Sequence, residues 1–130
     1  MGSDNVKTHK DLIVWQKAMD FAVAVYRSSQ MFPKSEIFGL SRQIRNSAVS
    51  IRSNVAEGHA QLTTVNYIRY LGIAKGSLRE TETHIHLARR LNYITQEIFE
   101  NLLVQSSELG RLLHGLLKAL RQTVRGRSNS

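Results

Sequence analysis

The stretch from Gly39 to Gly58, GLSRQIRNSAVSIRSNVAEG, places two different stripes on one predicted helix. Its apolar residues recur with the spacing of a single helix face: Leu40, Ile44, Ala48, Ile51 and Val55. A polar stripe follows the margin of that face: Gln43, Ser47, Ser50, Asn54 and Glu57. Polar groups in such a partly buried position are costly unless they are hydrogen-bonded. The stretch therefore predicts a helix that packs against a specific partner surface, in its own chain or in another.

Three further helical patterns accompany this one. The first spans about residues 12–31, with Asp11 as its N-cap. The third begins after Thr63-Thr64 and reaches about residue 92. The fourth follows Thr95, a second N-cap. The apolar face predicted for the first helix holds Leu12, Trp15, Met19, Ala22 and Tyr26. The breaks between the patterns are short, which favours antiparallel neighbours, and no stretch keeps the period of a strand. The chain is therefore predicted to be all-α, an antiparallel up-down-up-down four-helix bundle.

The bundle is predicted to occupy residues 11–123 as one domain. Residues 1–10 are expected to be a flexible N-terminus and residues 124–130 a basic flexible tail. Gly58 is predicted to end the second helix as its C′ residue. The chain has no cysteine, no signal-like apolar segment and no apolar run near the roughly 20 residues that a bilayer requires. We therefore expect a cytoplasmic protein without a membrane partner.

The sequence is strongly basic, with a formal net charge of +8. Such a balance favours an anionic partner, most often nucleic acid. Residues 111–130 contain no acid, and three arginines lie near one another on the second predicted helix. We predict phosphate contacts for Arg42, Arg45, Arg52, Arg111, Lys118, Arg121, Arg125 and Arg127. The alternative is a solvated face with scattered ion pairs, for example between Lys75 or Arg79 and a neighbouring glutamate.

A second group of residues is predicted to be structural, as a hydrogen-bonded network or an interface: Gln43, Ser50, Asn54, Glu57, Gly72, Gly76, Ser77 and Glu80. Polar core residues sometimes set the register of packed helices. Gly72 and Gly76 lie in a smooth patch of the third helix, where a helix of the same chain or of another subunit could approach closely. A buried glutamate can act as a base when its pKa is raised. Hydrogen bonding between helices nevertheless explains Asn54 and Glu57 better than catalysis does.

The sequence contains no arrangement that indicates an enzyme. It has no Walker-type or Rossmann-type glycine loop and no nucleophile elbow. His84 and His86 point to nearly opposite sides of a helix, and the Glu-x-x-His pairs of a di-iron bundle do not occur. Trp15 and Tyr67 fall on apolar stripes, which favours core or interface positions over a platform for stacking bases. We therefore expect no catalytic residue, no metal, no cofactor and no enzymatic activity.

Several motifs resemble one bacterial family. They are Asp11-Leu12-x-Val14-Trp15-Gln16-x-Ala18, Phe32-Pro33 with Glu36 and Phe38-Gly39-Leu40, Gln43-Ile44-Arg45, Ala48-Val49-Ser50-Ile51, Ser53-Asn54-Val55-Ala56-Glu57-Gly58, and Leu71, Ala74, Gly76-Ser77-Leu78, Glu80 and Glu82. The resemblance covers about residues 11–120, and it is to the four-helix bundle proteins encoded within intervening sequences of 23S ribosomal RNA. Arg52 departs from the family pattern, in which proline is common at that position.

The resemblance implies a bundle that assembles into a homopentameric ring. Related proteins of the same fold serve as accessory factors of diversity-generating retroelements, where they resemble small basic pentamers that bind a reverse transcriptase and RNA. The family has no established catalytic residues to carry over. We therefore expect a non-enzymatic, basic, homo-oligomeric scaffold that binds nucleic acid, RNA in particular, beside a protein partner such as a reverse transcriptase. The alternative is a protein-interaction module that does not bind nucleic acid.

Overall fold

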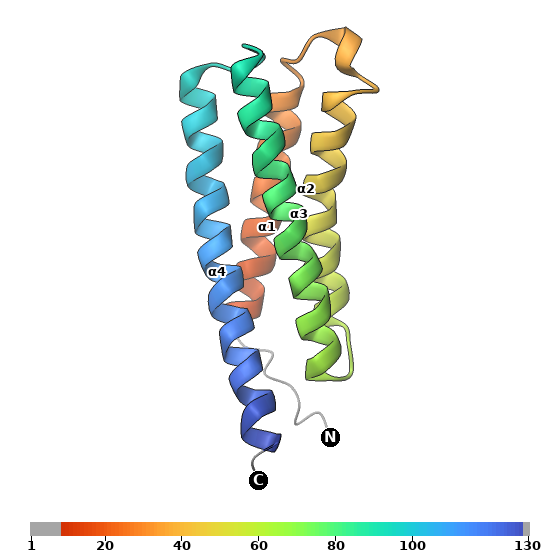
Figure 1. Ribbon diagram of the computed structural model, residues 1–130, viewed down its shortest axis with the longest axis vertical. Helices are drawn as coiled ribbons and strands as arrows, with labels where there is room; N and C mark the ends of the chain where they lie inside the picture. Colours follow the sequence, from red (N-terminus) through yellow and green to blue (C-terminus); the bar gives the residue numbers. More distant parts are fainter. Residues whose placement is uncertain (1–8, 129–130) are drawn as a thin grey trace.

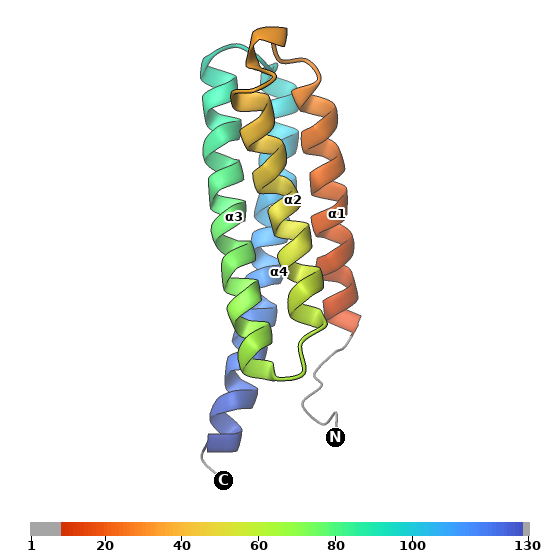
Figure 2. The same ribbon diagram turned by 90° about the vertical axis from the view of Figure 1, so that its right-hand side faces the viewer.

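The structure, a computed structural model, describes residues 9–128 and folds most of them into α-helix. α1 spans His9–Ser29, α2 Leu40–His59, α3 Thr64–Arg90 and α4 Gln96–Ser128, with a short 3₁₀ helix, η2, at Lys34–Glu36. The four α-helices lie side by side along one long axis (Figure 1, Figure 2). The α1–α2 and α3–α4 connections lie at one end, and the α2–α3 connection lies at the other. Residues 9–128 are thus all-α and contain no strand, as predicted.

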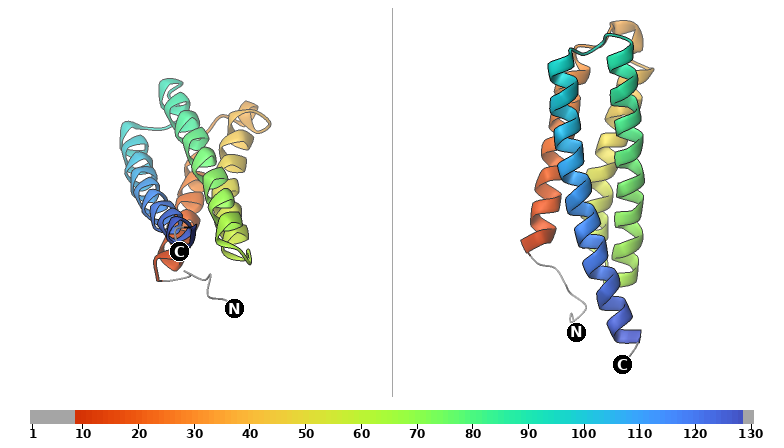
Figure 3. Two further views of the ribbon diagram at one scale, coloured as in Figure 1. Left: turned by 60° about the horizontal axis from the view of Figure 1, so that its bottom comes forward. Right: turned by 60° about the vertical axis from the view of Figure 1, so that its left-hand side comes forward.

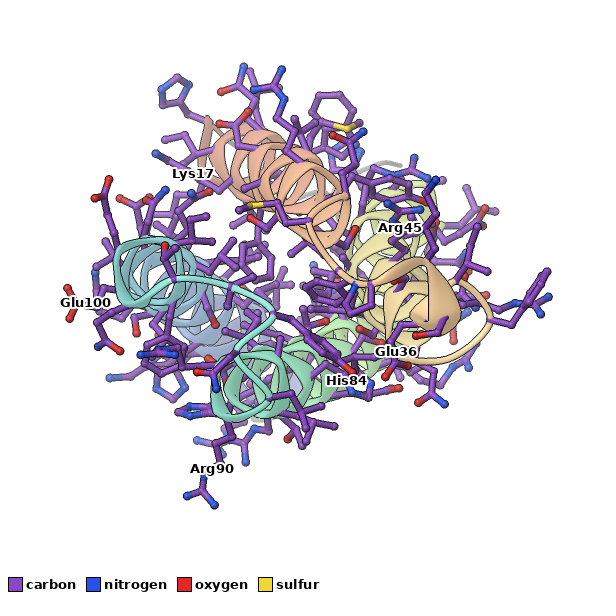
Figure 4. All side chains as sticks on the ribbon, turned by 90° about the horizontal axis from the view of Figure 1, so that it is seen from above. Lys17, Glu36, Arg45, His84, Arg90 and Glu100 are labelled. Carbon is purple, nitrogen blue, oxygen red and sulfur yellow. The ribbon has the colours of Figure 1, made fainter. Side chains whose placement is uncertain are left out.

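Each helix packs mainly against two of the others. α2 and α4 each contact both α1 and α3. Seen from above, α1 and α3 are diagonal across the bundle, and so are α2 and α4 (Figure 4). The groove between α1 and α2 therefore lies on the opposite side of the molecule from the groove between α3 and α4.

The apolar stripe of α2 is buried as predicted. Its members are at most 7% exposed: Leu40, Ile44, Ala48, Ile51 and Val55. They face a core to which every helix contributes, with Phe21 from α1, Leu71 from α3 and Leu113 from α4 among its fully buried members. Burying a large aliphatic or aromatic side chain contributes about 1.5–3 kcal/mol, so this core is the main source of stability.

The apolar face predicted for α1 is largely not the face that the core buries. Leu12, Trp15 and Tyr26 are exposed, and Ala22 is the one buried member of the predicted set. The buried face is instead made of other apolar residues: Val14, Ala18, Phe21 and Val25. α1 carries apolar side chains at most positions between Leu12 and Tyr26, so periodicity alone does not select the buried face. One apolar side of α1 is left uncovered within the described chain.

Side chains cap the helices where the sequence placed the boundaries of α3 and α4. Thr63 Oγ1 accepts a hydrogen bond from the backbone N–H of Asn66 at 3.2 Å. Thr95 Oγ1 accepts one from the N–H of Ile98, also at 3.2 Å. Both bonds satisfy N–H groups that have no partner within the helix. Asn92, between the two helices, adopts a φ of 61°, a left-handed conformation that asparagine tolerates better than most residues.

Gly58 and Asp11 have roles other than the predicted C′ and N-cap positions. Gly58 lies inside α2, which ends at His59, and a Cβ atom there would come within 2.9 Å of side-chain atoms of Tyr67 and Tyr70. Its missing side chain therefore lets α3 pack close to α2. Asp11 lies in the first turn of α1 and is buried, where it accepts a hydrogen bond from the Tyr67 hydroxyl. Burial, together with this bond, raises the pKa of Tyr67 above its usual value, so the phenol stays protonated.

The predicted ends of the bundle also need correction. α1 begins at His9, and α4 continues to Ser128, so residues 124–128 are helical rather than part of a flexible tail. The last turns of α4 project beyond the other helices (Figure 3). Arg127 Nη1 donates to Thr64 Oγ1 at 3.4 Å, and cations in the last turn favour the negative end of the helix dipole. The remaining terminal residues predicted to be flexible, 1–8 and 129–130, lie outside the described residues.

Candidate functional site

The cations predicted to contact phosphate separate into two sets. Arg42, Arg45 and Arg52 lie on α2, whereas Arg111, Lys118, Arg121, Arg125 and Arg127 lie on α4. Because α2 and α4 are diagonal in the bundle, a single protomer does not bring the two sets together.

The α2 arginines lie beside α1. Arg45 is half-buried, its Nε donates to Ser29 Oγ at 2.6 Å, and its guanidinium carbon lies 5.1 Å from the centre of the Tyr26 ring. Such a cation–π contact adds to the hydrogen bond. Arg52 lines a hollow of about 350 Å³ between α1 and α2, and Arg42 is exposed. Arg45 therefore joins α2 to α1 rather than standing free on the surface.

Apolar side chains dominate the α1 edge of this hollow, which we call the α1/α2 groove. Met19, Val23 and Tyr26 of α1 line it together with Val49 of α2. The same edge of α1 continues as an apolar stripe, the α1 stripe, whose members are exposed except for half-buried Met19: Leu12, Trp15, Met19, Val23 and Tyr26. Four of these five belong to the apolar face predicted for the first helix.

A larger groove, of about 830 Å³, lies between α3 and α4. We call it the α3/α4 groove. Cationic side chains line it from both helices, Lys75 and Arg79 from α3 and Arg111 and Lys118 from α4. These four residues are the groove cations. The groove is therefore flanked by positive charge on both walls.

No ion pair within residues 9–128 neutralises the groove cations. Glu108 pairs instead with Lys17 at 3.0 Å, and Glu80 with His84 at 3.4 Å. The described residues therefore do not form the ion pairs that the alternative prediction suggested, between Lys75 or Arg79 and a neighbouring glutamate. Unpaired cations retain their full attraction for an anion from solution.

Small residues make the groove hollow, and an acid marks one end. Gly110 and Gly115 line it, and a Cβ atom at Gly115 would meet nothing within 4 Å. Buried Leu78 contributes apolar surface. At the end nearest the α3–α4 connection, Glu82 accepts a hydrogen bond from the Ser106 hydroxyl. The positive charge is therefore concentrated away from that connection.

The cations of α4 extend the groove toward the C-terminal end of the helix. Arg111, Lys118 and Arg125 recur every seven residues, so they share one face. Arg121 and Arg125 are exposed, whereas Arg127 donates to Thr64. Sequence reasoning did not place Lys75 and Arg79 in this site. The available signal was their i, i+4 spacing beside the apolar face of the third helix.

The structure brings part of the predicted polar network together between α2 and α3. The Ser50 and Ser77 hydroxyls are 2.8 Å apart, and Asn54 Nδ2 donates to the Ser50 carbonyl oxygen at 2.8 Å. One turn away, Thr81 Oγ1 donates to Ser47 Oγ at 2.7 Å. Each bond crosses or supports the α2–α3 contact, which explains why polar groups border the apolar stripe of α2.

The other members of that predicted group lie elsewhere. Gln43, Glu57 and Glu80 are exposed, and Glu80 contacts His84 as described above. Gly72 and Gly76 face outward on α3, where added Cβ atoms would meet nothing within 4 Å. No described helix of the same chain therefore packs on this glycine patch.

Glu36 links the α1–α2 connection to the α3–α4 connection at the end of the bundle that holds η2. Its Oε1 accepts a hydrogen bond from the N–H of Leu40 at 3.0 Å, and its Oε2 accepts one from the Tyr93 hydroxyl at 2.7 Å. The backbone hydrogen bond from Leu40 and the bond from Tyr93 lower the pKa of Glu36, because both favour the carboxylate. The pKa of Tyr93 is raised by the same hydrogen bond. Figure 4 shows Glu36 at this end of the bundle.

The described residues contain no group of three or more histidine, aspartate or glutamate side chains able to hold a metal ion. None of the helices within residues 9–128 is long and apolar enough to cross a membrane.

Comparisons with known proteins agree on the fold. The family described as 23S rRNA-intervening sequence protein matches residues 10–115. A solved structure from Bacteroides thetaiotaomicron, a protein of unknown function from the S23 ribosomal protein family, is 32% identical. The two folds align with a TM-score of 0.77 over 84% of this chain and 98% of that chain. No curated protein matches the chain.

Proposed function

The chain belongs to the 23S rRNA-intervening sequence protein family, and from this premise we propose that it is a non-enzymatic basic scaffold that binds nucleic acid, RNA in particular. The observation that carries this proposal is the α3/α4 groove, where four cations from two helices have no acidic partner in the described chain. Contacts between such cations and phosphates release counterions and supply sequence-independent affinity. The name of the family, which refers to a ribosomal RNA, favours RNA over DNA.

We propose further that the protein is a homo-oligomer, a ring of five antiparallel up-down-up-down bundles as the resemblance implies. The exposed α1 stripe supports self-association, since large contiguous apolar patches on a surface mark interaction sites. A closed ring requires contacts between two different surfaces, and the glycine patch of α3 is a second candidate surface. Five copies of the α3/α4 groove would then bind one long RNA with increased avidity.

A second candidate function is a protein-interaction module without nucleic-acid binding. The α1 stripe is the observation that favours it, because an exposed apolar surface suits a protein partner as well as another copy of the chain. A reverse transcriptase is the kind of partner that the resemblance implies. In this case the net charge would serve solubility or an acidic partner protein.

One experiment separates these functions. RNA binding by the purified full chain is measured by fluorescence anisotropy at about 50 mM and about 200 mM salt, and the mass of the same sample is measured by light scattering. The scaffold proposal predicts an oligomer whose affinity for RNA falls steeply with salt. An oligomer that does not bind RNA even at the lower salt concentration would refute nucleic-acid binding and favour the protein-interaction module.

A further inference from the structure

We infer that the α3/α4 groove binds one strand of a nucleic acid between its two walls and excludes a duplex. This inference rests on the proposed function and adds the form of nucleic acid that the site accepts. It depends on the hollow shape of the groove, on the position of the groove cations on both walls, and on the side chains that the groove lacks.

Two glycines leave open space along the α4 wall of the groove. Gly115 has open space where a side chain would lie, and a Cβ atom at Gly110 would contact only Leu78 Cδ2, at 3.6 Å. A ligand can therefore approach the backbone of α4 closely, which is a common reason for glycine at a binding site. A strand that enters the groove would place sugar or base carbons against Leu78 and keep its phosphates at the charged walls.

The groove cations are spaced along both helices that form the groove. Lys75 and Arg79 are four residues apart, about 6 Å along α3, and Arg111 and Lys118 are seven residues apart, about 10 Å along α4. Phosphates of a single strand between the walls would meet cations from both sides. From Arg111 to exposed Arg125 the cations of α4 cover about 21 Å, the length of roughly six stacked nucleotides.

The α3/α4 groove lies between two adjacent helices and is therefore narrow. The axes of packed helices are about 8–10 Å apart, and the side chains of both walls fill part of that width. A duplex is a convex rod with two backbones, so it would rest on the rim of the α3/α4 groove and would not reach buried Leu78. A single strand is narrow enough to enter and to contact both walls.

The residues that line the groove also predict how it binds. Among the described residues that line it, only His114 carries a ring, so base stacking, the usual source of affinity for single strands, is limited to one imidazole. Binding should depend mainly on phosphate contacts and be tolerant of sequence. With about four phosphates contacted, the logarithm of the association constant should fall with the logarithm of salt concentration with a slope of about −3.

The test compares a short single-stranded RNA with the same sequence in a duplex, using the full chain and two glycine variants. Gly115→Leu adds an apolar side chain to the α4 wall of the groove without changing its charge. Gly126→Leu is the matched control, because Gly126 also lies in α4, also has open space around it, and does not line the groove. Both changes replace a helical glycine by a better helix former, so loss of folding is not expected. Circular dichroism and light scattering check folding and assembly.

We expect the unmodified protein to bind the single strand at least about tenfold more tightly than the duplex, and Gly115→Leu to remove at least about tenfold of that affinity. Gly126→Leu should stay within about twofold of the unmodified protein. Equal affinity for the two RNA forms, or equal single-strand binding by the two variants, would overturn the inference and leave the proposed function standing. Failure of the unmodified protein to bind any RNA would overturn both. Displacement of the RNA by an equal charge concentration of polyglutamate would overturn the inference in favour of an acidic protein.

Discussion

The α1/α2 side and the α3/α4 side of this bundle use arginine in opposite ways. Beside α1, Arg45 donates to Ser29 and lies against Tyr26, so its charge serves to join two helices. Across the molecule, the groove cations have no acidic partner among residues 9–128 and surround a hollow lined by Leu78 and two glycines. The surroundings of α1 are apolar and those of α4 are cationic. The same residue type therefore indicates packing on one side and anion binding on the other.

This difference shows why net charge alone is an incomplete guide to a binding surface. All eight predicted contact residues contribute equally to the net charge of +8, but they occupy two diagonal helices. A variant series that changes one side at a time can separate their contributions.

The largest expected effect is on RNA binding by the α3/α4 side. Reversing two groove cations, Arg111→Glu with Lys118→Glu, should weaken RNA binding by about 100-fold and flatten the salt dependence, because phosphate contacts are lost. The matched change on the other side is Arg42→Glu with Arg52→Glu, which reverses two α2 charges outside the α3/α4 groove and should stay within about twofold. Fluorescence anisotropy at several salt concentrations measures both. A loss of similar size in the control would show that RNA binding follows total charge rather than the α3/α4 side.

The next effect is on assembly through the α1/α2 side. Trp15→Glu places a charge in the exposed α1 stripe, so we expect the oligomer to dissociate while the helix content is unchanged. RNA affinity should then fall by about tenfold through lost avidity, with the groove itself intact. Light scattering gives the mass and circular dichroism the helix content. An unchanged mass would exclude the α1 stripe as the subunit contact.

A smaller effect is expected on stability. Arg45→Ala removes the hydrogen bond to Ser29 and the contact with Tyr26, which should lower the free energy of unfolding by about 1–2 kcal/mol. Arg111→Ala, on the opposite side, should leave this free energy nearly unchanged but weaken RNA binding. Urea unfolding and anisotropy on both variants provide the comparison. If Arg45→Ala instead weakened RNA binding without loss of stability, the assignment of roles to the two sides would be wrong.

The smallest expected effect is on the pH dependence of stability. It involves Glu36, at the end of the bundle that holds η2. The pKa of Glu36 is lowered from 4.5 by its hydrogen bonds, so its contribution to stability is present above about pH 4.5 and is lost as the pH falls toward the folded-state value. The Glu36→Gln variant should therefore have a lower Tm than the unmodified protein at neutral pH. Its Tm should also fall less when the pH is lowered. Thermal melts followed from neutral pH to below pH 4.5 test this. Parallel acid profiles for the two proteins would contradict the role given to Glu36.

The α2 stripe shows what could be predicted with success. Its apolar members recur on one helix face, and the other faces of α2 carry mainly small and polar residues, so the pattern favours one buried face, and all five predicted residues are buried. The threonine cap at Thr95 was equally readable, because a cap depends on neighbouring backbone alone. Helix number and type follow from such local signals.

The predictions for α1, Gly58 and the groove cations show what local sequence signals do not determine. These features depend on contacts with other helices. α1 has two apolar sides, and the choice between them depends on where α2 and α4 pack. Gly58 reads as a helix terminator, but its function depends on Tyr67 and Tyr70 of another helix. Lys75 and Arg79 gain their place in the candidate site from Arg111 and Lys118 of α4, which are more than thirty residues away from both.

The amino-acid sequence was sufficient for the four helices, the Thr95 cap, the buried stripe of α2 and the basic character of the chain. These properties depend on spacing within a helix, on backbone hydrogen bonds and on residue counts, which are all short-range or additive. Tertiary packing was needed to show which side of α1 is buried, which arginine is used in packing, and which cations meet across a groove. Those properties depend on the positions of helices relative to one another, and a helix periodicity contains no information about its neighbours.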